Sequence, residues 1–182
     1  MEKNNYGIFD INLILNKLKI KESFKIADLG CGKFEYFVKP LAERVGSDGL
    51  VYAVDILQDT VEDIKKSAWQ YNLKHIKAIW SDLEVYRGTK INSSSLDRVL
   101  LINVLNQSQK KKEILQEAIR ILKTNGLFLI IDWQLTASPL GPEPNRRVNP
   151  ETLKEVASRL GLKLVDEFNP GPYHFALIFN KL

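Results

Sequence analysis

The chain has 182 residues, of which 45% are hydrophobic and 26% are charged, and its formal net charge is +4. These values are typical of a soluble globular protein and predict a single domain, residues 1–182, with a substantial core. No apolar run approaches the roughly 20 residues that span a bilayer, and the N-terminus lacks the basic and apolar regions of a secretory signal. A lone cysteine, Cys31, excludes an internal disulfide. We therefore expect a cytoplasmic protein that does not bind membranes.

The positive charge is mild and dispersed. The only dense basic cluster is Lys110-Lys111-Lys112, at an expected helix start. A nucleic-acid interface normally needs clustered basic residues, preferably interleaved with exposed aromatic side chains. The charge pattern therefore favours a solvated helix face and argues against a nucleic-acid partner.

The chain begins with an expected helical lead-in, residues 1–22. Apolar positions between residues 8 and 19 recur at helical spacing after Asp10, a residue type that caps helix starts. A buried strand then ends in Gly30-Cys31-Gly32, and a helix is expected over residues 35–45. The glycines allow a tight turn and leave bare peptide groups beside a ligand. This stretch predicts a strand, a turn and a ligand-binding helix start.

Strands and helices alternate along the next hundred residues. We expect strands over residues 50–56, 75–80, 96–104 and 127–133, and helices over 59–71 and from Ser108, a possible cap, to Asn125-Gly126. The inner face of the helix over 59–71 is expected to carry Val61, Ile64, Ala68 and Trp69. Nearly continuous apolar strands separated by helices predict a mostly parallel sheet covered on both faces, which is an α/β fold.

The alternation of strands and helices stops at residues 135–149. This stretch contains three prolines, which preclude a regular helix there. Such a loop is usually a lid or a binding loop. Asn149-Pro150 then starts a helix that Gly161 ends. The link between the last two strands, 162–168 and 174–180, is too short for a crossover helix, so these strands should pair antiparallel.

Polar residues gather at the carboxyl edge of this expected sheet, where open parallel sheets bind ligands. A carboxylate at the end of the second strand, Asp55, is suited to accept hydrogen bonds from two ribose hydroxyls. An acid at the end of the third strand, Asp82, suits an amino group such as that of adenine. The nicotinamide fingerprint needs a small residue three positions after Gly32, where this chain has Glu35. The pattern thus favours S-adenosylmethionine over a nicotinamide cofactor.

Four stretches in order resemble the class I S-adenosylmethionine-dependent methyltransferases, and most of all the small soluble type related to ubiquinone/menaquinone-biosynthesis methyltransferases. They are residues 26–32, 51–56, 81–83 and 118–126, and the likeness covers roughly residues 24–135. The resemblance implies a Rossmann-like, doubly wound, seven-stranded sheet in the order 3-2-1-4-5-7-6, with strand 7 antiparallel, inside a three-layer α/β/α sandwich. It also implies S-adenosylmethionine as the cofactor.

The resemblance implies a role for each matching residue on the methionine and ribose side. Asp28, Gly30 and Gly32 would form the turn at the methionine end of the cofactor. Asp55 would hold the ribose hydroxyls, and Ile56 would pack on the adenine.

Roles on the adenine and acceptor side follow in the same way. Asp82 would accept from the adenine amino group, Leu83 would supply backbone contacts, and Asn103 would border the methyl group and the acceptor. The chain departs from the family at Phe34, where a third glycine is usual. A large side chain there could crowd the methionine end or could point into the core. A cofactor-binding protein with little or no transferase activity therefore stays open.

Transfer of a methyl group from a sulfonium needs mainly the alignment of acceptor, methyl carbon and sulfur, which can contribute about 7–11 kcal/mol. A base is needed only if the acceptor must lose a proton. His174 and Asp132 are the expected catalytic candidates, and a purely structural role for His174 at the start of an edge strand is an equal alternative. No metal-ligand spacing is present, so no metal is expected.

These observations predict an S-adenosylmethionine-dependent methyltransferase (EC 2.1.1.-) that acts on a small-molecule acceptor by in-line displacement. Trp133, Tyr173 and the proline-rich loop favour an apolar or aromatic acceptor. No Asn-Pro-Pro-Tyr-like segment follows the fourth strand, which disfavours amino methylation of DNA bases. Methyl transfer to RNA or protein, favoured only by the mild basicity, is the alternative among enzymes, and a nicotinamide-dependent oxidoreductase ranks third.

Overall fold

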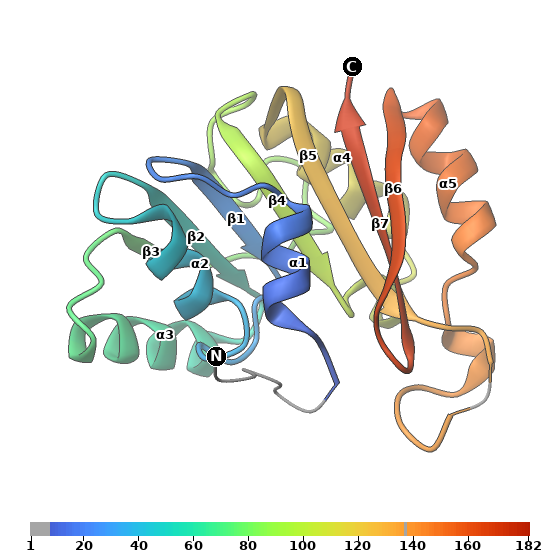
Figure 1. Ribbon diagram of the computed structural model, residues 1–182, viewed down its shortest axis with the longest axis horizontal. Coiled ribbons are helices and arrows are strands. Elements are labelled where there is room, and N and C mark those ends of the chain that lie inside the picture. Colours follow the sequence, from blue (N-terminus) through green and yellow to red (C-terminus); the bar gives the residue numbers. More distant parts are fainter. Residues whose placement is uncertain (1–7, 137) are drawn as a thin grey trace.

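The computed structural model describes residues 8–136 and 138–182. Within them, seven strands form one sheet in the order β3-β2-β1-β4-β5-β7-β6 (Figure 1). The strands are β1 (Lys25–Leu29), β2 (Leu50–Asp55), β3 (Ile76–Trp80), β4 (Leu96–Ile102), β5 (Leu122–Trp133), β6 (Leu162–Gly171) and β7 (His174–Lys181). Strand β7 runs antiparallel to both β5 and β6, and the other pairs are parallel. The predicted strand order and the antiparallel last strand are confirmed.

Helices cover both faces of this sheet (Figure 1). They are α1 (Ile11–Lys17), α2 (Val38–Val45), α3 (Gln58–Gln70), α4 (Lys111–Ile121) and α5 (Pro150–Arg159), with short 3₁₀ turns η1 (Leu105–Gln107) and η2 (Pro144–Arg146). Helices α1, α2 and α3 share one buried apolar cluster with one face of the sheet, and α4 and α5 share a second cluster with the other. Since side chains alternate along a strand, Leu100 belongs to the first cluster, whereas Val99 and Leu101 belong to the second. The three-layer architecture is thus confirmed.

Two predicted helix starts have the expected caps. The Asp10 carboxylate accepts the backbone N–H of Leu13 at 2.9 Å, and Asn149 Oδ1 accepts that of Glu151 at 2.9 Å. The first seven residues of the lead-in predicted over 1–22 lie outside the described residues.

Other predicted boundaries were wrong. Helix α2 begins at Val38, three residues later than expected, after a turn that buries Phe34 and Phe37. Helix α4 starts at Lys111 without a side-chain cap, and it ends at Ile121, well before Asn125-Gly126. It ends early because the fully buried Leu122 already pairs with Leu96 of the neighbouring strand.

Trp69 corrects a prediction about α3. We expected it on the inner face, but 83% of its surface is exposed. Val61, Ile64 and Ala68 are the buried positions of this helix. Because each helical residue turns by about 100°, the residue after Ala68 lies at the side of the buried stripe rather than on it.

A buried carboxylate attaches the segment after β3 to α4. Glu117 is 1% exposed, and its oxygens accept from Thr89 Oγ1 at 2.6 Å, Arg120 Nε and Nη2 at 2.8 Å, and Arg87 N at 3.1 Å. Burial by itself would raise the pKa of Glu117, but the hydrogen bonds from Arg120 and Thr89 together outweigh burial and lower the pKa. This cluster therefore fixes the chain that continues from the end of β3.

We predict that Glu117→Ala lowers the free energy of unfolding by about 3 kcal/mol, because it leaves a poorly solvated Arg120 without its partner. Urea denaturation at neutral pH measures the change. Since the pKa of Glu117 is lowered in the folded protein, its contribution is present at neutral pH and is lost as the pH falls below the usual range of a glutamate. The difference between the two proteins should therefore shrink in acid.

Glu151→Ala is the matched control, because Glu151 forms an exposed ion pair with Lys154 at 2.8 Å. Its loss should cost less than about 1 kcal/mol. Equal losses of unfolding free energy for the two substitutions would show that Glu117 contributes no more to stability than an exposed ion pair does.

Candidate functional site

A cavity of about 450 Å³ lies at the carboxyl ends of β1, β2 and β3 and beside the turn after β4. Its size falls in the range of small-molecule sites. Six of the eight predicted cofactor residues line it: Gly30, Gly32, Asp55, Ile56, Asp82 and Leu83. Sequence reasoning missed other lining residues: Leu57, Thr60, Ser81, Glu84, Val104, Gln107, Ser108 and Ile114. Several of these directly adjoin a predicted residue in the sequence, and that adjacency was a usable signal.

The Asp55 carboxylate is fixed by two turns. Its Oδ2 accepts the N–H of Gly32 at 3.0 Å, and its Oδ1 accepts the N–H of Leu57 at 3.0 Å. An ionised carboxylate has about four acceptor positions, so each oxygen can still accept a further hydrogen bond. The group is therefore oriented for two neighbouring hydroxyls, as a ribose presents them.

The two glycines hold conformations that favour glycine. Gly30 has φ +74° and Gly32 has φ +57°. A Cβ on Gly30 would lie 2.4 Å from Val104 Cγ2, whereas a Cβ on Gly32 would meet nothing within 4 Å. Gly30 therefore allows two chain segments to approach closely, and Gly32 leaves space for a ligand beside its backbone.

Asp28 lies beneath this turn and is 1% exposed. Its Oδ2 has no hydrogen-bond partner within the described part of the chain. Burial, and to a lesser extent the charge of Asp55, raise the pKa of Asp28 to about 7. A cationic amino group near this carboxyl would relieve both effects, and the methionine end of the expected cofactor carries one. The residues present thus fit that cofactor.

The other end of the cavity combines an apolar surface with ordered polar groups. Ile56 is 58% exposed, and its carbonyl accepts from Trp80 Nε1 at 2.8 Å. Asp82 Oδ1 accepts the N–H of Glu84 at 2.8 Å, and Ser108 Oγ donates to Glu84 Oε1 at 2.6 Å. An exposed apolar surface beside a fixed carboxylate suits a flat base that carries an amino group.

Phe34 does not line this cavity. Its side chain is buried in the core cluster on the α1–α3 face, and its ring stacks on Tyr71 with 5.6 Å between centroids. The side chain that replaces the expected third glycine therefore points into the core.

Two other predicted residues lie beside the cavity rather than in its lining. Asn103 has φ +56° and donates its N–H to the carbonyl of Ile131 at 2.9 Å. Asp132 is fully buried and accepts from Asn106 N at 3.2 Å, Asn106 Nδ2 at 3.0 Å and Trp133 N at 2.8 Å. Burial raises the pKa of Asp132. Its carboxyl thus fixes the chain after β4, and its catalytic role stays a prediction.

His174 is fully buried between two aromatic rings. Its centroid lies 4.6 Å from that of Phe9 and 4.1 Å from that of Trp133. Neither ring nitrogen has a hydrogen-bond partner within the described residues. Burial, followed by the charge of Arg147, lowers its pKa to about 4, so the imidazole is neutral at neutral pH. His174 is not part of the cavity lining, and its catalytic role also stays a prediction.

One guanidinium organises the loop predicted as a lid, residues 135–149. Arg147 is buried and donates to the carbonyls of Gln134 at 2.8 Å, Thr136 at 2.5 Å and Pro142 at 2.9 Å. A Cβ on Gly141 would lie 2.5 Å from the Trp133 ring, so the loop lies directly on that ring. Ala137 lies outside the described residues. The function of this loop as a lid stays a prediction.

Neither a metal site nor a membrane span is found in the part of the chain that the structure describes. No group of three or more His, Cys, Asp or Glu residues there could hold a metal ion. No helix among residues 8–136 and 138–182 is both long and apolar enough to cross a bilayer.

Known proteins resemble this chain in sequence and in fold. Aklanonic acid methyltransferase DauC from Streptomyces sp. is 28% identical over 108 residues, which are 57% of this chain and 49% of that protein. A probable cobalt-precorrin-6B C(15)-methyltransferase (decarboxylating) from Saccharolobus solfataricus is 29% identical over 119 residues, 65% of this chain and 57% of that protein. The chain thus spans about half the length of these curated relatives.

A crystal structure of a SAM-dependent methyltransferase from Aquifex aeolicus has the same fold, with a TM-score of 0.86 and 20% identity over 96% of this chain and 91% of that one. A family model described as "Methyltransferase domain" matches residues 20–164. Since that match covers most of the chain, the protein belongs to the methyltransferase-domain family and has the fold of the class I S-adenosylmethionine-dependent methyltransferases.

Proposed function

We propose that this protein binds S-adenosylmethionine in the 450 Å³ cavity and transfers its methyl group to a small-molecule acceptor. The observation that carries the proposal is the Asp55 carboxylate, which the N–H groups of Gly32 and Leu57 orient beside the cavity. A carboxylate in this place recognises the paired hydroxyls of a ribose.

The other lining residues complete the cofactor site. The exposed Ile56 and Leu57 side chains provide an apolar surface for the adenine, and Asp82 accepts from its amino group. At the other end, the bare backbone of Gly32 leaves room for the methionine chain. The buried Asp28 attracts its ammonium group, because a nearby cation lowers the cost of ionising that carboxyl.

When bound, S-adenosylmethionine supplies a methyl group on a positively charged sulfur. The protein then has to hold that group in line with the acceptor and keep water away from it. Val104, which contacts Gly30, limits the movement of the cofactor at this end. If the acceptor must lose a proton, the predicted bases are Asp132 and His174.

A small-molecule acceptor is supported by the names of the two curated relatives. Those proteins are named for aklanonic acid and for cobalt-precorrin-6B, both of which are small molecules. We extend that substrate class to this chain. The buried Phe34 removes the steric reason for expecting a protein that binds the cofactor without transferring its methyl group.

We predict that Asp55→Ala weakens the binding of S-adenosylhomocysteine, the demethylated product, at least tenfold. The substitution removes charge-assisted hydrogen bonds to the ribose, each worth about 1.5–3 kcal/mol, and it frees the Gly32 N–H. Isothermal titration calorimetry measures the affinity. Asp48→Ala, a change in the exposed turn before β2, is the control with the same loss of charge. Equal affinities of the two variants for S-adenosylhomocysteine would contradict the proposed contact between Asp55 and the ribose.

The class of acceptor can be tested by following a labelled methyl group. The protein is incubated with S-adenosyl[methyl-¹⁴C]methionine and an extract of its host cells, which is then separated into small molecules, RNA and protein. We expect label in the small-molecule fraction, and we expect much less with Asp55→Ala. Asp55-dependent label confined to RNA or to protein would contradict the small-molecule assignment.

A further inference from the structure

The sheet has an open edge at β3, far from β6 at its other end (Figure 1). Within the described residues, β3 pairs only with β2. Val51 N donates to the carbonyl of His75, and Ser81 N donates to that of Asp55. In a parallel ladder this register directs the backbone of every second residue toward β2. The N–H and C=O groups of Ala78 therefore face away from the sheet, where they can pair with another strand.

A cavity of about 370 Å³ lies beside this edge, between β3 and the outer side of α3. It is lined by Lys65, Ala68, Trp69, Asn72, Leu73, Lys74, Ile76 and Ala78. Four of these side chains are aliphatic: Ala68 belongs to the core cluster of the α1–α3 face, and Leu73, Ile76 and Ala78 pack against it. The cavity therefore has an apolar floor that continues from the core to the open edge.

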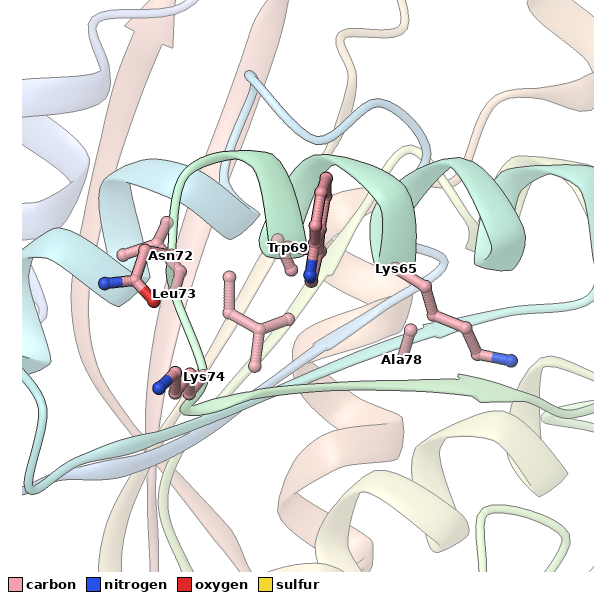
Figure 2. A pocket seen from close by; sticks show the side chains of 8 residues that line it. Lys65, Trp69, Asn72, Leu73, Lys74 and Ala78 are labelled. Atoms are coloured by element: carbon pink, nitrogen blue, oxygen red, sulfur yellow. The ribbon is translucent and has the colours of Figure 1, made fainter.

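The side chain of Trp69 is exposed beside this open edge. In Figure 2 its indole lies between Lys65 on one side and Asn72, Leu73 and Lys74 on the other. It is 83% exposed, and Trp80 at the end of β3 is 59% exposed. Tryptophan is enriched among the residues that dominate protein–protein binding, because it can bury a large apolar area. The exposed indole of Trp69 beside an open strand edge indicates an interaction surface.

The charges beside this cavity favour an acidic partner. The lining contains two lysines and no acidic residue. Lys65 forms an ion pair with Glu62 at 2.7 Å, whereas Lys74 makes no ion pair within the described part of the chain. A strand that carries carboxylates would meet complementary charge.

We propose that the open edge of β3 and the cavity beside Trp69 form a docking site for an extended acidic segment of a partner protein. The segment adds a strand to the sheet through the outward backbone groups of β3 and places an apolar side chain in the cavity against Trp69. In such strand addition, main-chain hydrogen bonds supply affinity, and pockets for alternate side chains supply specificity. This docking site is independent of the proposed methyl transfer.

Selection from a displayed library of random twelve-residue peptides tests the proposal, with the full-length protein as the target. We expect the enriched peptides to be acidic with alternating apolar residues. In fluorescence anisotropy, the fluorescein-labelled enriched peptides should bind at least tenfold more weakly to Trp69→Ala. This variant should fold normally, because the side chain that it removes is mostly exposed. Its thermal unfolding and its affinity for S-adenosylhomocysteine are the checks.

Two further variants separate the parts of the site. Ala78→Pro removes a backbone N–H that faces away from β2, and proline is tolerated at such edge positions. It should weaken peptide binding at least tenfold without loss of the fold. Lys74→Glu should also weaken binding, whereas Arg159→Glu, the same charge change at an exposed position of α5, should have little effect.

Four results would overturn the proposal. The first is a selection that enriches no peptide, and the second is enriched peptides that bind the wild-type protein and Trp69→Ala equally. The third is Trp69-dependent binding of a labelled twelve-nucleotide oligouridine without binding of acidic peptides, which would indicate a nucleic-acid surface. The fourth is concentration-dependent dimerisation in analytical ultracentrifugation that Trp69→Ala abolishes, which would assign the edge to a second copy of this chain.

Discussion

The carboxylate of Asp55 connects the two turns on which the candidate site depends. One oxygen accepts from Gly32, in the turn after β1, and the other accepts from Leu57, in the turn after β2. These are different segments of the chain, and the carboxylate holds them at a fixed separation. The cavity between them is therefore shaped before any ligand arrives, which reduces the ordering that binding would otherwise require.

This arrangement places two carboxyl groups in one poorly solvated region. Asp28 lies under the same turn, and burial together with the charge of Asp55 raises its pKa to about 7. Such a pair is unfavourable when both groups are ionised, and a bound cation relieves it. The local electrostatics thus favour a cationic ligand, such as one with an ammonium group and a sulfonium.

The part of the sheet's carboxyl edge around β5 and β7 differs from the part around β1, β2 and β3 in how its side chains are covered. There His174 lies between Phe9 and Trp133, and Arg147 binds the loop that covers the tryptophan ring. The part around β1, β2 and β3 is open, with Ile56 exposed, whereas His174 in the part around β5 and β7 is fully buried. Of the strand-end acids, Asp55 and Asp82 line the cavity, whereas Asp132 is fully buried outside its lining and accepts from Asn106 and Trp133.

The fold, and which strand-end residues line the cavity beside β1, β2 and β3, could be predicted from the sequence, because both depend on local patterns. Apolar strands that end at Asp55 or are followed closely by Gly30 or Asp82 mark both the sheet and its carboxyl edge. The surroundings of Asp132 and His174 depend instead on tertiary contacts with Asn106, Phe9 and Arg147, which no spacing reveals. The exposure of Trp69 was missed for a related reason. An aromatic residue that follows a buried position of a helix is easily assigned to the buried face, although Trp69 lies at the side of α3.

The central claim is that this cavity binds S-adenosylmethionine through Asp55. Parallel calorimetric titrations with S-adenosylmethionine, S-adenosylhomocysteine and NAD test it most directly. The structure leads us to expect one-to-one binding of both adenosyl compounds and no measurable binding of NAD. Tight binding of NAD without binding of either adenosyl compound would contradict the account.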